Sequence, residues 1–359
     1  MQEDFHYYAT YCAALLAGYN HIDSLDICYG AQLVDHCSRS WLKKSGGPSM
    51  AATTQLQAEL LQARTDPIGL CDITRIWSAF HFLPRDLYAN VDKGSKSYKD
   101  KYRLICGPNG DLLEDTVNLA KNKGLEAAGI AMHVLADTWA HTYFAGTPSL
   151  VINNTNWYFY ELFPVEGAEP ERRQIVFSHN PSASEDVDKP VYVGSVYQFH
   201  EHSIMNLGHG RAGHLPDYSY IRYVYLPAWG DYKEIIKDNP NDYEYAFAQM
   251  VYALSYLKGD IDVFEKDTYE FDKIQPHLEK IRRIISKRQV DASDDWKAFG
   301  ESLSGEEIPD FDMDKYISQY VHSQDKANTY LGRFFYGVLS QKKMVVEKIK
   351  GSGNKLAGM

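Results

Sequence analysis

Residues 127–146 read AAGIAMHVLADTWAHTYFAG and place His133, Asp137 and His141 at successive four-residue steps. Because an α-helix turns once in about 3.6 residues, these steps stack the three side chains along one helix face. The residues around them are mostly apolar, so the helix is suited to burial and its polar groups need partners there. A divalent metal satisfies imidazoles and a carboxylate together. We favour a metal site over the alternative, a core in which His and Asp bond only to each other.

The composition is ordinary for a soluble globular protein. The 359 residues, 44% hydrophobic and 24% charged, are enough to bury a large core. The formal net charge of −11 argues against broad binding to phosphate backbones, which relies on clustered Lys and Arg. We therefore do not expect binding to double-stranded nucleic acid.

The cysteines and the start of the chain bear on location. The five cysteines include no CxxC pair and several have apolar helical neighbours, so we interpret them as reduced core thiols: Cys12, Cys28, Cys37, Cys71 and Cys106. No run reaches the length of a membrane span, and residues 1–11 carry acidic groups where a secretory signal carries basic ones. We expect no transmembrane segment and a cytoplasmic location.

Apolar periodicity predicts a mainly α protein, built as a multi-helix bundle with an irregular insertion that contains minor β-structure. Besides the helix in 127–146, we expect helices over 7–19, 24–41, 55–64, 112–120, 197–206, 243–258, 274–288 and 315–339. We interpret the polar segment 90–111 as a surface loop.

Five prolines and short β-prone pieces mark residues 147–195 as the irregular insertion, with a small hairpin. Residues 346–359 are basic and contain glycine, and we expect a flexible tail there. The expected organisation is one large helical metal-binding domain over 1–345. The sequence does not indicate an oligomeric state.

Other residues of the metal-ligand type fall into separated clusters rather than being spread evenly. The candidates are Asp4 and His6 in EDFHYY, Asp35, His81 in AFHFLP, and His209, His214 and Asp217 in LGHGRAGHLPD. Each cluster alone is more typical of a buried histidine, a helix cap or a salt bridge. Together with the central helix they supply ligands for more than one metal, since one zinc takes about four. Asp137, with two carboxylate oxygens, is the natural bridge between two ions.

These residues carry a family resemblance. The pattern His133-xxx-Asp137, followed shortly by His141 and preceded by Asp35 and His81, resembles the zinc-dependent phospholipase C and single-strand-specific zinc nuclease superfamily. That superfamily usually spaces the bridging Asp and the next His by six residues, whereas Asp137 and His141 are four apart. Its members are mostly helical and hydrolyse phosphate esters with a three-zinc cluster. The resemblance covers roughly the first 220 residues. The same phrases also resemble an uncharacterised bacterial protein family, which we take as a remote branch of this superfamily.

The resemblance implies a distribution of the ligands over three zinc ions. One ion would be shared by Asp35, His81, His133 and Asp137, a second would be bridged by Asp137 and held with His6, and a third would join His141 to the segment with His209, His214 and Asp217. The last ligand pair departs from the family's His-xxx-Glu or His-xxx-Asp, because here His214 and Asp217 are three apart.

The beginning of the chain also differs from the pattern of this superfamily. Members of the superfamily begin with a tryptophan whose amino group and carbonyl bind zinc, whereas this chain starts at Met1. We expect Asp4, two residues before His6, to substitute.

The predicted function is hydrolysis of a phosphate ester through a polynuclear site with two or three zinc ions. The substrate is a small-molecule or lipid phosphate ester, either a phospholipid headgroup or a nucleotide or nucleic acid. Manganese and iron suit the same ligands. Asp35, Asp137 and Asp217 are the catalytic candidates: Asp137 bridges, and Asp35 or Asp217 accepts a proton. The alternative is a non-catalytic protein with a structural metal site or a histidine-rich core.

Side chains that would hold the rest of a substrate are less well defined. Arg85 and Arg211 are candidates to contact a phosphate oxygen, with a solvated surface role as the alternative. Trp77, Trp139 and Tyr143 are candidates to stack on a base or an acyl chain, although their helical phases favour core packing. The apolar run at 150–163 fits a lipid-binding rim or the core, and we favour the core for most of it.

Overall fold

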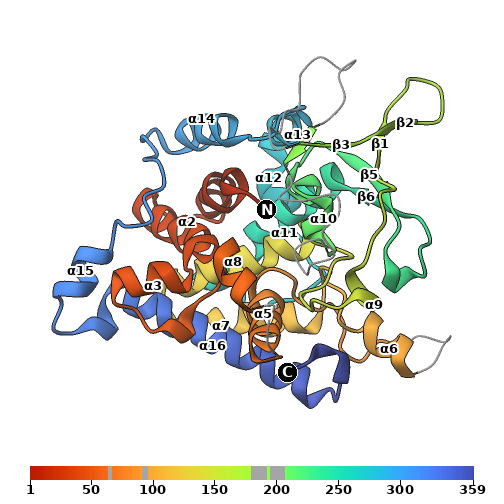
Figure 1. The fold of residues 1–359 in the computed structure, drawn as a ribbon. Coiled ribbons are helices and arrows are strands. Elements are labelled where there is room, and N and C mark those ends of the chain that lie inside the picture. Colours follow the sequence, from red (N-terminus) through yellow and green to blue (C-terminus); the bar gives the residue numbers. More distant parts are fainter. Residues whose placement is uncertain (64–66, 91–95, 179–191, 195–206) are drawn as a thin grey trace.

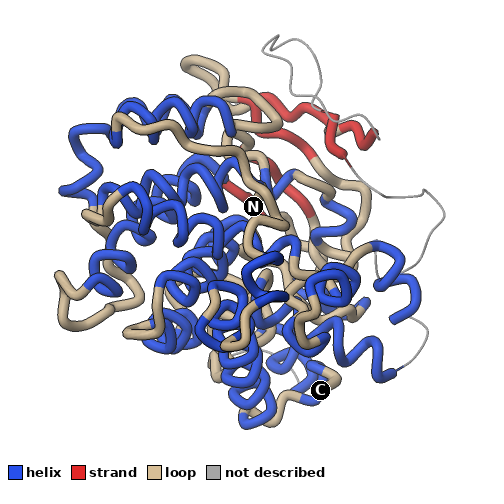
Figure 2. The backbone as a smooth tube through the Cα atoms, turned by 90° about the vertical axis from the view of Figure 1, so that its left-hand side faces the viewer, coloured by secondary structure: helices blue, strands red, loops and turns tan. Residues whose placement is uncertain are grey.

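The computed structural model describes residues 1–63, 67–90, 96–178, 192–194 and 207–359. Most of them are helical, and a small sheet lies at one end of the helices (Figures 1 and 2). The mainly α class with minor β-structure is therefore confirmed. No helix in these ranges is both long and apolar enough to cross a membrane.

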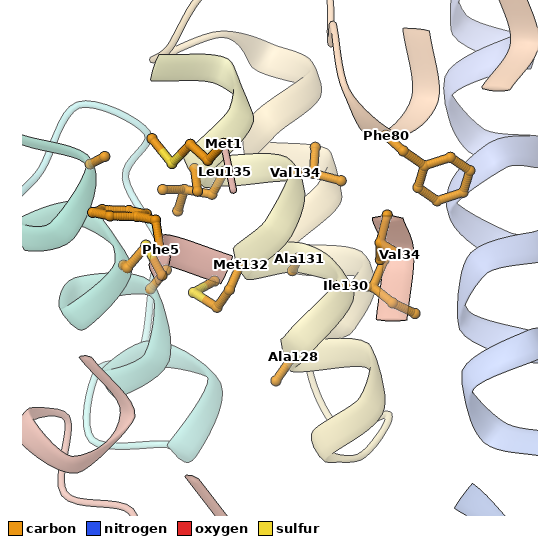
Figure 3. Close-up of a cluster of buried hydrophobic side chains, with 14 of the residues drawn as sticks. Met1, Phe5, Val34, Phe80, Ala128, Ile130, Ala131, Met132, Val134 and Leu135 are labelled. Carbon is orange, nitrogen blue, oxygen red and sulfur yellow. The ribbon is translucent and has the colours of Figure 1, made fainter. Parts of the chain in front are cut away.

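The centre of the helical part is α8 (Leu125–Ala140), in which every residue except Leu125 is buried. The helices that pack most extensively on it are α2 (His21–His36), α7 (Asp111–Ala120), α11 (Asn239–Lys258) and α16 (Tyr330–Gly351). In Figure 3, Phe5 and Met132 lie on one side of α8, and Val34 and Ile130 lie on the other. Apolar contacts on several faces explain why this helix is hydrophobic almost all round.

The contact between α2 and α8 requires glycine. A Cβ atom on Gly129 of α8 would lie 2.3 Å from the carbonyl oxygen of Ile27, and one on Gly30 of α2 would lie 3.3 Å from that of Glu126. The two backbones therefore approach more closely than side chains would permit. This approach brings the end of α2, with Asp35, against the ligand-bearing face of α8.

The remaining helical elements surround this core. They are η1 (Asp4–Ala9), α1 (Thr10–Leu16), α3 (Arg39–Ser45), η2 (Ser49–Ala51), α4 (Gln57–Ala63), α5 (Pro67–Phe80), α6 (Lys96–Tyr102), α9 (Leu150–Asn153), α10 (His209–Ala212), η4 (Leu215–Asp217), η5 (Ala228–Gly230), α12 (Phe271–Ile274), η6 (Gln275–His277), α13 (Leu278–Ser286), α14 (Ser293–Ser304), α15 (Ile317–His322), η7 (Lys326–Asn328) and η8 (Lys355–Ala357).

All five cysteines are free thiols, as expected, and four of them are buried.

The antiparallel sheet has the order β2 (Glu171–Gln174), β1 (Tyr160–Phe163), β5 (Arg222–Tyr225), β6 (Ile235–Asp238). The hairpin expected within 147–195 is present as β1 and β2, with Tyr160 opposite Gln174. The other two strands of this sheet, β5 and β6, follow residue 220, where no strand was predicted. A separate parallel pair joins β3 (Val176–Ser178) to β4 (Tyr192–Gly194).

Three predicted helices are interrupted. The helix expected over 24–41 ends at His36, and α3 restarts after Ser38, whose hydroxyl accepts the amide of Trp41 as a helix cap. The segment 274–288 breaks where Pro276 lies in η6. The segment 315–339 divides into α15 and α16, and Thr329 caps the second helix.

Other boundaries also differ from the expectations. The predicted loop 90–111 contains α6, and α5 was not predicted. The expected helix 197–206 lies outside the described residues. We expected a flexible tail from residue 346, but α16 continues through this segment to Gly351. Ile349 and Ala357 are buried there, and the amide of Asn354 donates to the carbonyl of Asp100. These apolar contacts with the body of the protein order a segment that composition alone marks as a tail.

Candidate metal centre

The ligand-type side chains converge from distant parts of the chain. Three groups each hold three ligand atoms that lie within 4.8 Å of one another: His6, His133 and Asp137; Asp35, His81 and His133; and His141, His209 and Asp217. The elements that supply them are η1, α2, the end of α5, α8 and the segment of α10 and η4. Eight of the ten predicted ligands are thus brought together.

Asp137 occupies the centre of the cluster and is almost fully buried. Its Oδ1 lies 3.2 Å from Nε2 of His6, and its Oδ2 lies 3.1 Å from Nδ1 of His81 and 3.3 Å from Nε2 of His133. Burial acts to raise the pKa of Asp137, but the neighbouring imidazoles, led by His141, and the chain's amino group hold it well below its usual value. The carboxylate is therefore ionised, with one oxygen directed to each side of the cluster.

The rings of His81 and His133 are oriented by backbone carbonyls. Nε2 of His81 lies 2.9 Å from the oxygen of Thr53, and Nδ1 of His133 lies 3.0 Å from the oxygen of Ala31. A carbonyl oxygen only accepts, so each of these nitrogens carries a proton. In the neutral rings the other two nitrogens then present lone pairs, and these atoms lie 3.3 Å apart, facing Asp137.

This arrangement requires a positive charge between the rings. Two lone pairs and a carboxylate oxygen at such separations repel unless a proton or a metal ion lies among them. In a tetrahedral site with bonds of about 2.0–2.1 Å, the ligand atoms lie about 3.3 Å from one another. The separations of 3.1–3.3 Å between His81, His133 and Asp137 match that edge length. The residues present therefore fit a metal ion.

His6 lies on the other side of His133. The two rings stack with centroids 3.9 Å apart, and neither nitrogen of His6 has a hydrogen-bond partner among the described residues. Burial lowers the pKa of His6 to about 4, so the ring is neutral and offers a lone pair. The element that carries it, η1, is a π-helix, a rare form that frequently occurs at functional sites.

The third group is built around Asp217. Nδ1 of His141 lies 2.6 Å from the carbonyl oxygen of His81, which directs its Nε2 to 3.3 Å from Oδ1 of Asp217, and Nε2 of His209 lies 3.4 Å from the same oxygen. Gly208, with φ of 53°, begins the short helix that carries His209. His214 stands outside the group: its Nδ1 lies 3.0 Å from Oδ2 of Asp217, and its side chain is half exposed.

The amino group of Met1 lies inside the cluster. It is 2.7 Å from Oδ1 of Asp137, 3.3 Å from Oδ1 of Asp217 and 3.3 Å from Nε2 of His141. Burial acts to lower the pKa of this amine, but the carboxylates, Asp137 first, raise it to about 11. The reading of side-chain motifs missed this group. The signal that could have indicated it was the zinc-binding amino terminus of the superfamily that the sequence resembles.

Asp4 does not join the three groups, contrary to the expectation that it would substitute for a terminal ligand. Its Oδ2 accepts the amide of Ala292, 3.1 Å away at the start of α14, and burial raises its pKa to about 7. On a strand, side chains two positions apart point to the same face, so Asp4 would lie beside His6 in the cluster. Both residues lie on the helical turn η1, where side chains two positions apart point in different directions.

The cluster reaches the protein surface through some of its ligands. The side chains of Asp35 and His209 are 28% and 21% exposed, whereas those of His6, His133 and Asp137 are exposed by 1% or less. A small molecule could therefore approach the cluster at Asp35 and at His209, whereas the inner ligands are shielded from solvent.

The candidates for substrate contact have other partners. Arg211 is buried and donates to the carbonyl of Thr155. The indole of Trp139 donates to Gln249 within the core, as its helical phase predicted. Arg85 and Tyr143 line a separate cavity.

The fold and the site together define a class: mainly helical proteins with a buried cluster of imidazoles and carboxylates that is suited to metal ions. The chain belongs to a protein family of unknown function, DUF6765, whose sequence profile matches residues 1–349. No curated protein and no solved structure matches it.

Proposed function

We propose that this protein is a hydrolase of phosphate esters that uses two or three metal ions, most simply zinc, held by the three ligand groups. The observation that carries the proposal is the orientation of His81 and His133. Backbone carbonyls fix both rings so that their lone pairs converge on Asp137. Such outer hydrogen bonds are the usual support of metal-binding histidines.

Each ligand group would hold one ion. Asp35, His81 and His133 would form the first site, His6 and Asp137 the second, and His141, His209 and Asp217 the third. Asp137 has one oxygen directed to each of the first two groups, so it would bridge them. Metal ions at such sites lower the pKa of bound water towards about 7 and neutralise charge that builds up on a phosphate oxygen.

The protein's own side chains have separate roles in this proposal. Asp35 is the most exposed carboxylate of the cluster, so it would accept a proton from an attacking water. Asp217, buried beside His141 and His209, would remain ionised, because its neighbours hold its pKa well below the usual value. The apolar side chains around α8 exclude water from the inner ligands.

Phosphate esters, rather than another substrate class, are favoured by the resemblance to the phospholipase C and zinc nuclease superfamily. Two observations support that resemblance. The described residues contain three ligand groups, which correspond in number to a three-zinc cluster, and the amino group of Met1 lies between Asp137 and Asp217.

Elemental analysis of the protein, purified without chelator or added metal, tests the proposal together with a hydrolysis assay. We expect two or three equivalents of zinc per chain, and turnover of bis(4-nitrophenyl) phosphate or 4-nitrophenyl phosphate that Asp137→Asn abolishes. Metal without any turnover would favour the structural-site alternative. An intact protein with no metal would leave a histidine-rich core stabilised by the buried amino group.

A further inference from the structure

A cavity of about 190 Å³ lies beside the metal centre and is not part of it. It is bounded by α6, by η5 and by the segments that follow His81 and His141. The lining residues that matter here are Arg85, Tyr102, Cys106, Tyr143 and Trp229. At about 30 Å³ per water molecule, the space holds roughly six waters, which is about the size of one ring with one charged substituent.

One wall of the cavity is aromatic. The rings of Tyr143 and Trp229 are nearly parallel, at 26°, with centroids 6.0 Å apart, and Tyr102 meets Trp229 edge to face at 6.0 Å. Trp229 is buried, whereas Tyr102 and Tyr143 are each more than one third exposed. An offset pair of this kind presents ring faces and edges to a planar ligand.

The backbone of Tyr143 is strained in a way that fixes this wall. Its φ is 77°, in the left-handed region that a bulky residue rarely adopts. The carbonyl of Tyr143 accepts hydrogen bonds from Nε1 of Trp229 at 2.8 Å and from the hydroxyl of Tyr225 at 3.2 Å. Strain of this kind costs on the order of 1–3 kcal/mol and persists where the surroundings enforce it, often at ligand sites.

Two charged residues line the cavity, Arg85 and Asp86. The side chain of Arg85 is exposed, and among the described residues no ion pair or side-chain hydrogen bond engages its guanidinium. Its charge opposes the burial that raises the pKa of Tyr143, which places it near that hydroxyl. The neighbouring carboxylate, Asp86, accepts the amide of Tyr88 at 2.8 Å. The cavity thus combines an available cation with an aromatic wall.

We propose that this cavity binds a small anion carrying a single planar ring, with Arg85 pairing the anionic group and Tyr143 and Trp229 contacting the ring. A guanidinium pairs with a carboxylate through two parallel hydrogen bonds, and aromatic faces select planar ligands. The proposal does not depend on the hydrolase activity or on bound metal.

The cavity is nevertheless linked to the metal centre through the backbone. The amide of Tyr143 donates to the carbonyl of Cys106, and the amide of Arg85 donates to that of Ile105. Arg85 follows the ligand His81 by four residues, and Tyr143 follows the ligand His141 by two. The segments that carry these two histidines thus continue into the cavity wall, and both are bonded there to residues 105 and 106. A ligand in this cavity would contact the residues that follow both histidines.

Calorimetric titration of the full chain with benzoate tests the proposal. We expect binding, with about tenfold weaker affinity for benzamide, which lacks the charge, and for cyclohexanecarboxylate, which lacks the planar ring. Arg85→Gln should weaken benzoate about tenfold and leave benzamide unchanged, whereas Arg85→Lys should retain part of the affinity. Arg283→Gln, at an exposed arginine on α13, is the matched control and should bind benzoate normally.

The aromatic half is tested independently by Tyr143→Gly, which removes the ring and suits the positive φ. It should weaken benzoate and benzamide alike, and it keeps the proposal testable if Arg85→Gln does not fold. Asp137→Asn should leave benzoate affinity unchanged. Absence of benzoate binding would overturn the proposal, as would equal affinities of the Arg85→Gln and Arg283→Gln variants, or binding that Asp137→Asn alone removes.

Discussion

Nδ1 of His81 lies 3.3 Å from Nε2 of His133, and both nitrogens face Oδ2 of Asp137. The two rings are held in this position from behind, by the carbonyl oxygens of Thr53 and Ala31. Four backbone segments are needed to produce this one relationship between two side chains. It is the feature on which the metal assignment depends.

Loss of His133 should remove metal and stability together. His133 belongs to two of the three ligand groups, so His133→Ala should release at least one ion. The free energy of unfolding should fall by about 3 kcal/mol if free metal exceeds its Kd about 100-fold. Metal analysis and thermal unfolding measure both effects. His36→Ala is the control, because His36 stacks on Phe311 outside the cluster; unchanged metal content in His133→Ala would refute the ligand assignment.

The close contact of α2 and α8 gives a prediction about stability. Gly129→Ala would place a methyl group 2.3 Å from the carbonyl oxygen of Ile27, which is backbone and cannot rotate away. We expect the free energy of unfolding in urea to fall by about 2 kcal/mol or more. Gly351→Ala, in α16 with nothing within 4 Å, should change it by less than about 0.5 kcal/mol. Equal effects of the two substitutions would contradict the described packing.

Lys342 gives a pH dependence away from the metal centre. Burial lowers the pKa of its amine to about 8, although the amine donates to the carbonyls of Met50 and Ala52. Between pH 8 and the unfolded value of 10.5, the unfolded chain binds more protons than the folded one, so stability rises with pH. Relative to Lys342→Met, the wild type should gain about 1 kcal/mol or more across that range. If the difference in the free energy of unfolding between wild type and Lys342→Met did not change with pH, the pKa of the amine would be the same in the folded and unfolded chains.

The ion pair of Arg288 and Glu161 joins the sheet to the segment after α13. Both side chains are nearly buried, and Nη2 of Arg288 lies 3.1 Å from Oε2 of Glu161. Arg288→Met would leave the carboxylate buried without a partner and should cost about 3 kcal/mol. Adding Glu161→Gln to this variant should restore much of the loss in a double-mutant cycle. Additive losses in the cycle would mean that the two groups do not interact.

Helix boundaries were predicted best where caps and periodicity agree. The segments 112–120 and 243–258 match α7 and α11 within a few residues. The prediction was wrong where one helix ends and another begins within a single apolar pattern, as at Ser38 and Thr329. The apolar residues keep their helical spacing across these positions, although the hydroxyl of each residue caps a new helix. Strands β5 and β6 were missed because β5 pairs with β1, more than 60 residues earlier in the chain, and β6 in turn pairs with β5.

The sequence by itself determined the ligand face of α8, because the four-residue spacing of His133, Asp137 and His141 is a property of helix geometry. It also indicated the outlying residues that contribute to the cluster. Only the tertiary structure decided which nitrogen of each ring faces the centre, that Asp4 accepts the amide of Ala292, and that the amino group of Met1 lies beside Asp137. The physical reason is that these outcomes depend on backbone carbonyls and amides from other segments, whose positions follow from packing and not from local periodicity.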